Sequence, residues 1–401
     1  MTIPENIKYV LDTLNVKGFE AYMVGGCVRD MIMGKTPSDF DITTNALPEE
    51  IISCFPDKNC VLSGMKHGTV APIVNHEAVE ITTYRIDGEY RDSRHPEEVY
   101  FTKKIEEDLS RRDFTVNAMA MGKGFNVIDP FSGKTDIENK IIRCVGEAEK
   151  RFTEDALRIM RALRFSSTLG FSIEEETKNA IFKLYPLLSN IAKERIFTEL
   201  KKLIAGENAG KILAEYKDVF VFIMPKLATL PEDKYFENAK RVGGKDMTLD
   251  FALLTDGLSK EDTSALFNTL KTDRKLKDEV LCLISEKEED ISDLFKMKCF
   301  LKTREAEYAA KLIDFKLLTG RAEEKERNRL KSLLGTASAG CTKIKDLAIT
   351  GKDIMKFGAS GKAVGEILVR LILMIIEEKC ENEAERLKIE AEKLVNSINC
   401  D

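Results

Sequence analysis

YMVGGCVRDMIMGKTPSDFDITT, residues 22–44, is the stretch of sequence that decides the fold. Residues 22–24 form a short apolar run that leads directly into Gly25 and Gly26, after which helical spacing begins. A second strand is predicted over residues 40–43. Short strands that alternate with helices and with frequent turn residues indicate an α/β or α+β domain.

Two carboxylates stand at the entry to the second strand. Asp39 and Asp41 are two residues apart, so strand alternation predicts that both side chains point to the same face of the sheet. Two carboxylates held close together repel each other unless a cation lies between them, and Mg²⁺ prefers oxygen ligands and also bridges nucleotide phosphates. A bare DxD pair also fits an ordinary strand entry, and the neighbouring glycine turn favours the metal site. We therefore predict that Asp39 and Asp41 are the metal ligands and catalytic residues of a phosphoryl transfer.

The glycine turn provides the phosphate-binding half of such a site. Gly25 and Gly26, directly after a strand, let backbone N–H groups approach a triphosphate. The helix that follows adds the positive end of its dipole, and Arg29 in its first turn can pair with phosphate oxygens. Gly26 and Arg29 are therefore predicted to bind a nucleotide.

The run from GGCVRDMIMG to DFDITTNALPEEI resembles the signature of the polymerase-β-type nucleotidyltransferases, in the branch that holds class II CCA-adding enzymes and bacterial poly(A) polymerases. The resemblance is strong over residues 20–205 and diffuse beyond them. It implies an α+β, polymerase β-like nucleotidyltransferase head with a mixed sheet, followed by an all-α neck, body and tail. It also implies a third acidic side chain beside the metals, for which Glu80 in VEITTYR is the candidate. A solvated glutamate on a strand is the alternative for Glu80.

A second basic motif follows in EEDLSRRDFTVNAMAM, residues 106–121. RRDFTVNA is similar to the family's second motif, which implies that Arg112 contacts the incoming nucleotide and that Asp113 and Asn117 help to hold the sugar and the scaffold. The polar segment before it, residues 88–99, resembles a mobile loop. The family resemblance implies that enzymes which add the terminal adenosine retain this loop, and here it is intact.

RFTEDALRIMRALRF, residues 151–165, is predicted to open a helix, with Thr153 as its N-cap and acidic residues in its first turn. Asp155 and Arg158 are three residues apart and share a face, so they present an acceptor beside a planar set of donors. Cytosine and adenine both show an exocyclic amine beside an unprotonated ring nitrogen, which matches a carboxylate and a guanidinium. Uracil and guanine show a carbonyl beside an N–H group, which matches neither. A capped helix with salt-bridged, exposed arginines is the alternative.

EDALRIMRALRF resembles the family's template motif position for position, which implies that Asp155 and Arg158 choose the base. Glu154 precedes Arg158 by four residues and is placed to orient its guanidinium. Arg161 and Arg164 continue at steps of three, which rotates them around the helix toward a triphosphate or a tRNA phosphate. Both are predicted to bind the nucleotide.

The coarse pattern along the chain separates a sheet-bearing part from a helical remainder. Helical spacing is predicted over residues 4–17, and further strands over 69–74 and 79–84, which makes a mixed sheet of about four or five strands. From Thr153 onward almost everything has 3.6-residue periodicity. The predicted division is a head over residues 1–140, a neck over 141–206, a body over 207–335 and a tail over 336–401.

IAKERIFTELKKL, residues 191–203, resembles the family's last motif, in which we expect Arg195 and Glu199 to stabilise the neck helices. The tail carries a local excess of positive charge, and the basic residues concerned are Lys343, Lys345, Lys352, Lys356, Lys362 and Arg370. The family resemblance implies that body and tail grip the acceptor arm and TΨC region of tRNA by shape and phosphate. A glycine-punctuated helical turn is the alternative for each lysine.

Composition limits the class of protein. The 401 residues suggest two to four domains, and 43% hydrophobic with 32% charged residues is typical of a soluble, largely helical protein. No stretch reaches the roughly 20 apolar residues of a membrane span, and the N-terminus lacks a signal peptide, so we expect a cytoplasmic protein without a membrane partner. A net charge of -6 leaves RNA binding to local patches. Nothing in the sequence implies an obligate protein partner.

The resemblance, with the residues that carry it, implies template-independent addition of C, C and A to the 3′ end of tRNA from CTP and ATP, with two Mg²⁺ ions and release of pyrophosphate. An A-adding enzyme or a bacterial poly(A) polymerase is the alternative among enzymes. A catalytically silent tRNA-binding protein on the same scaffold is the alternative outside them. TTNALPEEI and the intact loop favour CCA addition.

Overall fold

The computed structural model describes residues 2–88 and 99–398. Most of the predicted loop over residues 88–99 therefore lies outside the described residues. The chain divides into two compact units. The first comprises Met1–Asp250 and Ser264–Asp273, and the second comprises Phe251–Thr263 and Arg274–Asp401.

The first unit begins with a mixed sheet, as predicted. In the described part of the chain it has eight strands in the order β10-β9-β1-β2-β6-β4-β3, with β5 paired to β4. The strands are β1 (Ala21–Val24), β2 (Asp41–Thr44), β3 (Cys60–Val61), β4 (Thr69–Val74), β5 (Glu77–Ala78), β6 (Ile81–Thr83), β9 (Ala120–Met121) and β10 (Val127–Ile128). β2 and β6 are parallel, whereas β1 and β2 are antiparallel. The predicted four or five strands are too few because β3, β5, β9 and β10 are two residues long, too short to show an alternating pattern.

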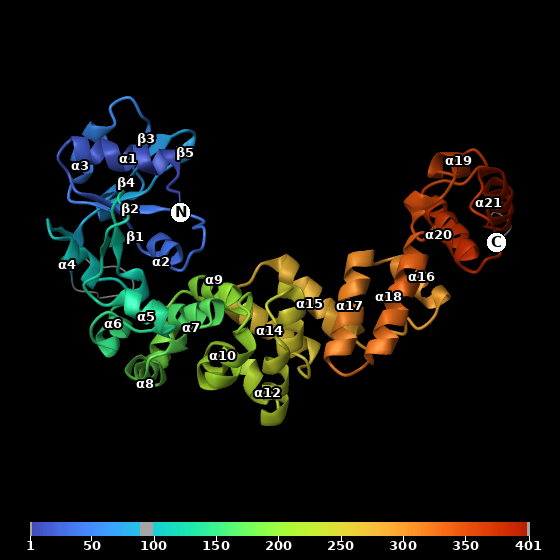
Figure 1. Cartoon of the computed structure of the whole chain (residues 1–401). Coiled ribbons are helices and arrows are strands. Elements are labelled where there is room, and N and C mark those ends of the chain that lie inside the picture. Colours follow the sequence, from blue (N-terminus) through green and yellow to red (C-terminus); the bar gives the residue numbers. More distant parts are fainter. Residues whose placement is uncertain (1, 89–98, 399–401) are drawn as a thin grey trace. The chain divides into compact units, whose positions relative to one another are not determined.

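Helices cover this sheet and connect its strands. They are α1 (Glu5–Val16), α2 (Gly26–Ile32), α3 (Pro48–Cys54), α4 (Ile105–Ser110) and α5 (Gly133–Glu138), with the short 3₁₀ turns η1 (Met65–His67) and η2 (Thr115–Asn117). α1 buries Ile7, Val10, Leu11 and Leu14, which recur at helical spacing and form its apolar face. α1 and α3 lie side by side over the strands (Figure 1). A separate hairpin of β7 (Arg85–Asp87) and β8 (Val99–Phe101) stands beside α4.

The rest of the first unit is helical, apart from a short parallel pair of β11 (Ile141–Ile142) and β12 (Ser172–Ile173). Its helices are α6 (Ala148–Glu154), α7 (Leu157–Leu169), α8 (Glu175–Leu184), η3 (Tyr185–Asn190), α9 (Lys193–Ile204), α10 (Ala209–Glu215), α11 (Lys217–Ile223), η4 (Pro225–Thr229) and α12 (Glu232–Arg241). α13 (Met247–Leu254) and α14 (Lys260–Leu270) lie where the two units divide. α7 and α9 pack closely along each other.

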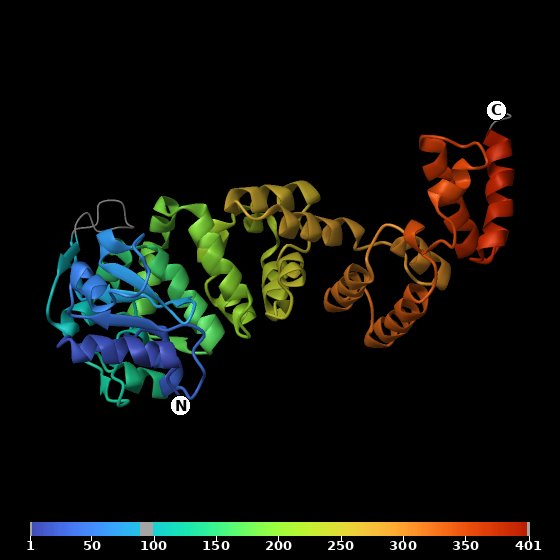
Figure 2. The same cartoon turned by 90° about the horizontal axis from the view of Figure 1, so that it is seen from above.

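The described part of the second unit consists of helices with short connections. They are α15 (Arg274–Glu286), α16 (Leu294–Leu301), α17 (Ala306–Leu318), α18 (Glu324–Ser338), η5 (Ile344–Asp346), α19 (Gly351–Met355), α20 (Lys362–Ile376) and α21 (Ala384–Ile398). α19, α20 and α21 lie together around one apolar cluster that includes Ile354, Leu371 and Leu387 (Figures 1 and 2). The prediction of an all-helical remainder is confirmed apart from β12.

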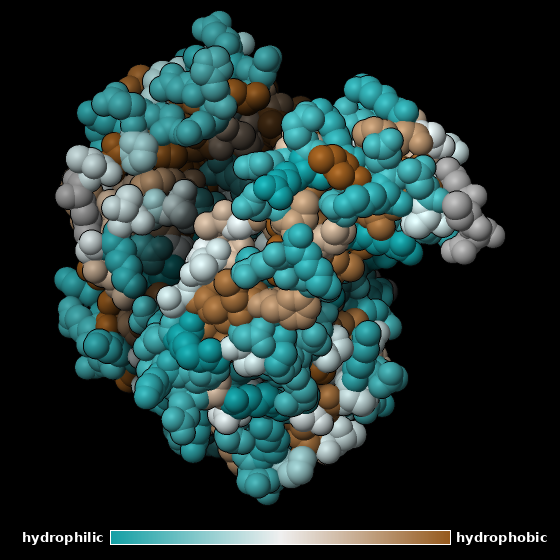
Figure 3. All heavy atoms as spheres, turned by 90° about the vertical axis from the view of Figure 1, so that its right-hand side faces the viewer, coloured by the Kyte–Doolittle hydropathy of each residue, from teal (hydrophilic) through white to brown (hydrophobic). Residues whose placement is uncertain are grey.

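The surface is polar over most of the face drawn in Figure 3, and apolar residues there form small separate patches. Across residues 2–88 and 99–398, no helix combines the length and the apolar character needed to cross a membrane.

Candidate active site

The sheet register brings the glycine turn and the acidic residues together. β1 and β2 run antiparallel with Val24 opposite Asp41. Gly25 follows with φ 81° and ψ -134°, a conformation open to glycine because it has no Cβ, and the chain then enters α2. On the other side of β2, the N–H of Ile42 donates to the carbonyl of Glu80 at 3.0 Å. Asp41 therefore lies between the glycine turn and Glu80.

An open pocket of about 600 Å³ is lined by four acidic residues, Asp39, Asp41, Glu77 and Glu80. β2 begins at Asp41, so Asp39 precedes the strand and the alternation argument does not apply to it. Both side chains nevertheless line the same pocket. The pKa of Asp41 is raised, first by loss of solvation; Arg112 opposes this, and repulsion from Glu80 and Asp39 reinforces it. A bound cation would relieve that excess of negative charge.

The carboxylates of this pocket suit a metal ion that binds together with a nucleotide substrate. In the chain as described, no cluster of three or more His, Cys, Asp or Glu side chains is arranged to hold a metal ion. Asp39 and Asp41 offer two carboxylates. Mg²⁺ is commonly held by one or two carboxylates, while waters and substrate phosphates complete its octahedron. The residues present therefore fit Mg²⁺ brought in with a nucleotide.

A buried carboxylate that is not among the predicted site residues anchors the second basic motif. Asp108 of α4 is fully buried and accepts from Nη2 of Arg111 at 2.8 Å and from Nη2 of Arg112 at 3.4 Å. Burial opposes the charge of Asp108, but the two arginines lower its pKa overall. Its place three and four residues before two arginines on a helix is the signal that could have revealed it.

Arg112 lies against the glycine turn. Its Nη1 is 3.1 Å from the position that a Cβ on Gly25 would take, so the absence of a side chain at Gly25 makes room for the guanidinium. Its Nε is buried and has no hydrogen-bond partner among the described residues. A buried donor without an acceptor is costly, and an anionic ligand is one way to satisfy it.

A chain of hydrogen bonds joins α2, the second motif and α7. Nε of Arg161 donates to Oδ2 of Asp113 at 2.7 Å, and Nδ2 of Asn117 donates to Oδ1 of Asp113 at 3.2 Å. Nη1 of Arg29 then donates to Oδ1 of Asn117 at 2.7 Å. Burial opposes the charge of Asp113, yet Arg161 and Asn117 help to hold its pKa at about 2. Asp113 is therefore ionised and fixes the orientation of Arg161.

Three arginines surround one aromatic ring. The guanidinium carbons of Arg29, Arg161 and Arg164 lie 5.2, 5.5 and 4.0 Å from the ring centroid of Phe165, within the range of cation–π attraction. Nε of Arg164 is also 3.0 Å from Oε2 of Glu199. Burial lowers the pKa of Arg164, with Glu199 acting against it and Arg161 reinforcing it. Phe165 was not predicted as a site residue, and its place at the end of the template motif is the only sequence signal for it.

The predicted start of a helix with Thr153 as its N-cap is wrong. α6 ends just before Asp155, which is extended at φ -142° and ψ 103°, and α7 begins at Leu157. Thr153 is not an N-cap, because it lies inside α6 and its hydroxyl donates to the carbonyl of Glu149 at 2.8 Å. Oδ1 of Asp155 instead accepts the N–H of Leu157 at 3.0 Å. The carboxylate of Asp155 accepts the backbone N–H two residues ahead, and this hydrogen bond favours a break over a continued helix.

Arg158 is held on three sides. Its Nη1 donates to Oε2 of Glu154 at 2.8 Å and to the carbonyl of Arg151 at 3.3 Å. Its Nη2 donates to the carbonyl of Arg111 at 3.1 Å, which ties α7 to the second motif. The predicted contact between Glu154 and Arg158 is confirmed, and the side chain of Arg158 is only 10% exposed. A guanidinium held in this way presents a defined set of donors.

Two side chains of α9 contact Asp155 and α7. Nη2 of Arg195 donates to Oδ2 of Asp155 at 3.3 Å, and Glu199 pairs with Arg164. Both contacts join α9 to residues of the template motif, where this pair is predicted to stabilise the neck helices. All the predicted site residues lie in the first unit; they are Gly26, Arg29, Asp39, Asp41, Arg112, Asp155, Arg158, Arg161 and Arg164.

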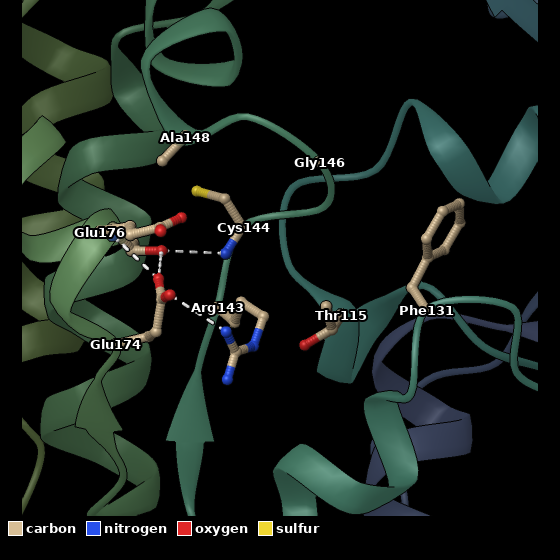
Figure 4. A pocket seen from close by; sticks show the side chains of 9 residues that line it. Thr115, Phe131, Arg143, Cys144, Gly146, Ala148, Glu174 and Glu176 are labelled. Carbon is tan, nitrogen blue, oxygen red and sulfur yellow. Dashed lines mark hydrogen bonds and ion pairs between the residues drawn. The ribbon is translucent and has the colours of Figure 1, made fainter.

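A second pocket, of about 190 Å³, is lined mainly by residues of α8, by the residue before it and by the segment that follows β11. Arg143 donates to Asp136 at 3.1 Å. It also donates to Glu174 at 3.0 Å, and Thr177 donates to Glu174 at 2.8 Å (Figure 4). Cys144 points into the same space in Figure 4, but burial raises its pKa to about 12, so it is not a thiolate. The polar groups satisfy one another, and we assign this pocket no substrate.

Comparison with known proteins identifies the class. The poly A polymerase head domain family matches residues 21–143, the family described as "Probable RNA and SrmB-binding site of polymerase A" matches residues 170–229, and tRNA nucleotidyltransferase domain 2 matches residues 245–390. The three matched domains are those of a tRNA nucleotidyltransferase.

Relatives narrow this class to one family. The CCA-adding enzyme of Geobacillus kaustophilus is 36% identical over 389 residues, which span 94% of each chain. That of Geobacillus thermodenitrificans is 51% identical over 204 residues, 51% of this chain and 50% of its own. A crystal structure of the Bacillus stearothermophilus CCA-adding enzyme in complex with CTP matches with a TM-score of 0.80 and 30% identity, over 99% of this chain and 100% of that one. The chain belongs to the CCA-adding enzyme family of tRNA nucleotidyltransferases.

Proposed function

We propose that this chain adds C, C and A to the 3′ end of tRNA from CTP and ATP and releases pyrophosphate. The observation that carries the proposal is the match to a CCA-adding enzyme over 94% of both chains. Solved relatives are described as bound to CTP, to ATP and, for Thermotoga maritima, to tRNA. In this proposal the predicted head and neck hold the nucleotide, while the body and tail hold the tRNA.

Asp39 and Asp41 would hold two Mg²⁺ ions in the acidic pocket. Their shared pocket and the raised pKa of Asp41 support this assignment. When bound, the ions lower the pKa of the attacking 3′-hydroxyl and neutralise charge on the leaving pyrophosphate. The two carboxylates fix where that chemistry occurs, because the β1–β2 register sets Asp41 opposite the residue that precedes the glycine turn.

The triphosphate would lie against the glycine turn and the neighbouring arginines. The residues assigned to it are Gly26, Arg29, Arg112, Arg161 and Arg164. Arg112 has an unsatisfied Nε, and the arginines around Phe165 form a local excess of positive charge. Asp113 and Asn117 orient two of these arginines and leave spare N–H donors on each guanidinium.

Base choice is assigned to Asp155 and Arg158. An aspartate accepts a hydrogen bond from the exocyclic amine of cytosine or adenine, and a guanidinium donates to the adjacent ring nitrogen. Uracil or guanine would set a carbonyl against the aspartate and an N–H against the arginine, leaving buried polar groups unpaired. Sites of this kind can discriminate by about 10⁴-fold. The contacts of Arg158 with Glu154 and with two backbone carbonyls support the assignment, because they hold the donors in place.

tRNA would contact the tail through its basic residues. Lys343 pairs with Glu305 and Lys356 pairs with Asp353, so these two are already neutralised. Lys345, Lys352, Lys362 and Arg370 are exposed, and no ion pair is found for them in the described part of the chain. We assign phosphate contacts to these four.

The test is incorporation of labelled CTP, ATP, UTP and GTP with Mg²⁺ onto tRNA transcripts that end before, within and after the CC of CCA. The double variant Asp39→Ala with Asp41→Ala is the blank. Ordered addition of C, C and A that then stops supports the proposal.

Other outcomes select the alternatives. Addition of A alone to the CC-ended transcript would indicate an A-adding enzyme, and long A tails on any RNA would indicate a poly(A) polymerase. No incorporation above the blank, together with retained tRNA binding in a filter assay, would leave a catalytically silent tRNA-binding protein.

A further inference from the structure

α9 presents two charged side chains to the nucleotide-recognition elements. Arg195 and Glu199 are four residues apart and so share one face of the helix. Arg195 contacts Asp155 before the start of α7, and Glu199 contacts Arg164 two turns further along α7. The two contacts therefore act on different parts of the proposed nucleotide site, the base and the triphosphate.

The orientation of Asp155 depends on few contacts. The residue is extended between two helices, so helical backbone geometry does not fix its side chain. Oδ1 accepts the N–H of Leu157 at 3.0 Å, and Oδ2 accepts Nη2 of Arg195 at 3.3 Å. A carboxylate has about four acceptor positions, so both oxygens keep lone pairs for a ligand. Arg195 makes the only side-chain contact to the Asp155 carboxylate that we find in the described residues.

Within residues 2–88 and 99–398, the side chain of Arg195 makes no other hydrogen bond. It is 27% exposed, and its Nη1 is buried without a hydrogen-bond partner in the described part of the chain. An unsatisfied buried donor is costly, and a group of this kind calls for an explanation such as a functional role. The ion-pair partner found for Arg195 among these residues is the carboxylate proposed to recognise the base.

We propose that Arg195 is a specificity-determining positioning residue, which holds the Asp155 carboxylate in the orientation that accepts the amine of cytosine or adenine. The inference rests on the proposed role of Asp155. Each of the two side chains proposed to recognise the base is then held by one neighbouring charged side chain, which we call its clamp. Glu154 holds Arg158, and Arg195 holds Asp155. Loss of the Arg195 clamp would let the carboxylate rotate, so that C and A lose their advantage over U and G.

The test measures kcat/KM for CTP and UTP on a tRNA transcript that lacks CCA, in the full chain. For Arg195→Met, which keeps the bulk of the side chain but no donors, we expect the CTP-to-UTP ratio to fall about tenfold, because misplacement of a recognition group by about 1 Å can cost up to ~100-fold. The fall should come from a lower kcat/KM for CTP, while kcat/KM for UTP changes little. If this variant does not fold, Arg195→Gln carries the test with the same expected direction.

Glu199→Gln is the matched control on the same helix face. It releases Arg164, so it should raise KM for both nucleotides alike and leave their ratio unchanged. A ratio unchanged in Arg195→Met, or an equal loss for both nucleotides, overturns the inference and makes Arg195 a structural residue.

Asp155→Ala separates the two proposals. If it leaves the ratio unchanged, the proposed role of Asp155 fails. If it collapses the ratio while Arg195→Met does not, only the positioning role fails. In the double variant, the substitution at Arg195 should lower the ratio no further than Asp155→Ala alone, because the clamp then has nothing to hold.

Discussion

Asp113→Asn is expected to destabilise the first unit in a pH-dependent manner. The side chain of Asp113 is 9% exposed and accepts hydrogen bonds from Arg161 and Asn117. Its pKa falls from 3.8 to about 2 on folding, which corresponds to about 2 kcal/mol at about 1.36 kcal/mol per pH unit. Because the folded pKa is depressed, this stability is fully present above about pH 4 and is lost as pH falls through about 2. Asp113→Asn lacks this contribution to stability at every pH.

The free energy of unfolding should therefore differ by about 2 kcal/mol between wild type and Asp113→Asn at pH 6, and the difference should shrink below pH 4. The chain has no tryptophan, so Phe182→Trp, at a residue stacked on Tyr216 in the first unit, supplies a fluorescence probe in both proteins. Urea unfolding at pH 6, 4, 3 and 2.5 measures the difference. Asp12→Asn, which breaks an exposed pair with Lys123, is the control and should change little. An equal loss of stability with pH in wild type and Asp113→Asn would refute the reasoning.

Three further substitutions, with Gly18→Ala as a control, test the site and the proposed RNA surface. Glu154→Gln removes the charged partner of Arg158 but leaves its backbone acceptors, so the CTP-to-UTP ratio of kcat/KM should fall about tenfold; an unchanged ratio would contradict the clamp. Gly25→Ala places a Cβ at φ 81° and 3.1 Å from a site arginine, so it should cost about 1 to 3 kcal/mol by thermal unfolding and raise KM for both nucleotides. Gly18→Ala, also at positive φ but with open space around it, should lower stability with no change in KM. Lys352→Glu should weaken tRNA binding and reduce the slope of log K against log salt by about 1; an unchanged slope would remove that lysine from the interface.

Local sequence signals predicted those features in which neighbouring residues decide the outcome. The glycine turn after β1 and the strand at residues 69–74 were predicted correctly, because alternation and left-handed glycine geometry act over a few residues. The helix break at Asp155 was missed, because an aspartate can either continue a helix or cap the next one. Periodicity does not distinguish the two.

Asp108 and Phe165 were missed for a different reason. Each contacts arginines from the surrounding motifs. Spacing along the chain places Asp108 near Arg111 and Arg112, and Phe165 near the arginines of the template motif, but it does not show that folding will bury these side chains. In the sequence, Asp108 is one acidic residue in a polar run. Only the structure shows that it is buried and accepts hydrogen bonds from Arg111 and Arg112. The partners of a buried charge are decided by folding.

The sequence by itself determined the class of fold, the motif order and the chemical types at the site, because those depend on residue identity and short spacing. The tertiary structure alone decided which charges meet. It placed Asp41 between the glycine turn and Glu80, linked Arg29 to Arg161 through Asn117 and Asp113, and brought Arg195 of α9 to Asp155 across 40 residues of chain. Such long-range pairs depend on how the sheet and helices pack, and short spacings in the sequence do not record that packing.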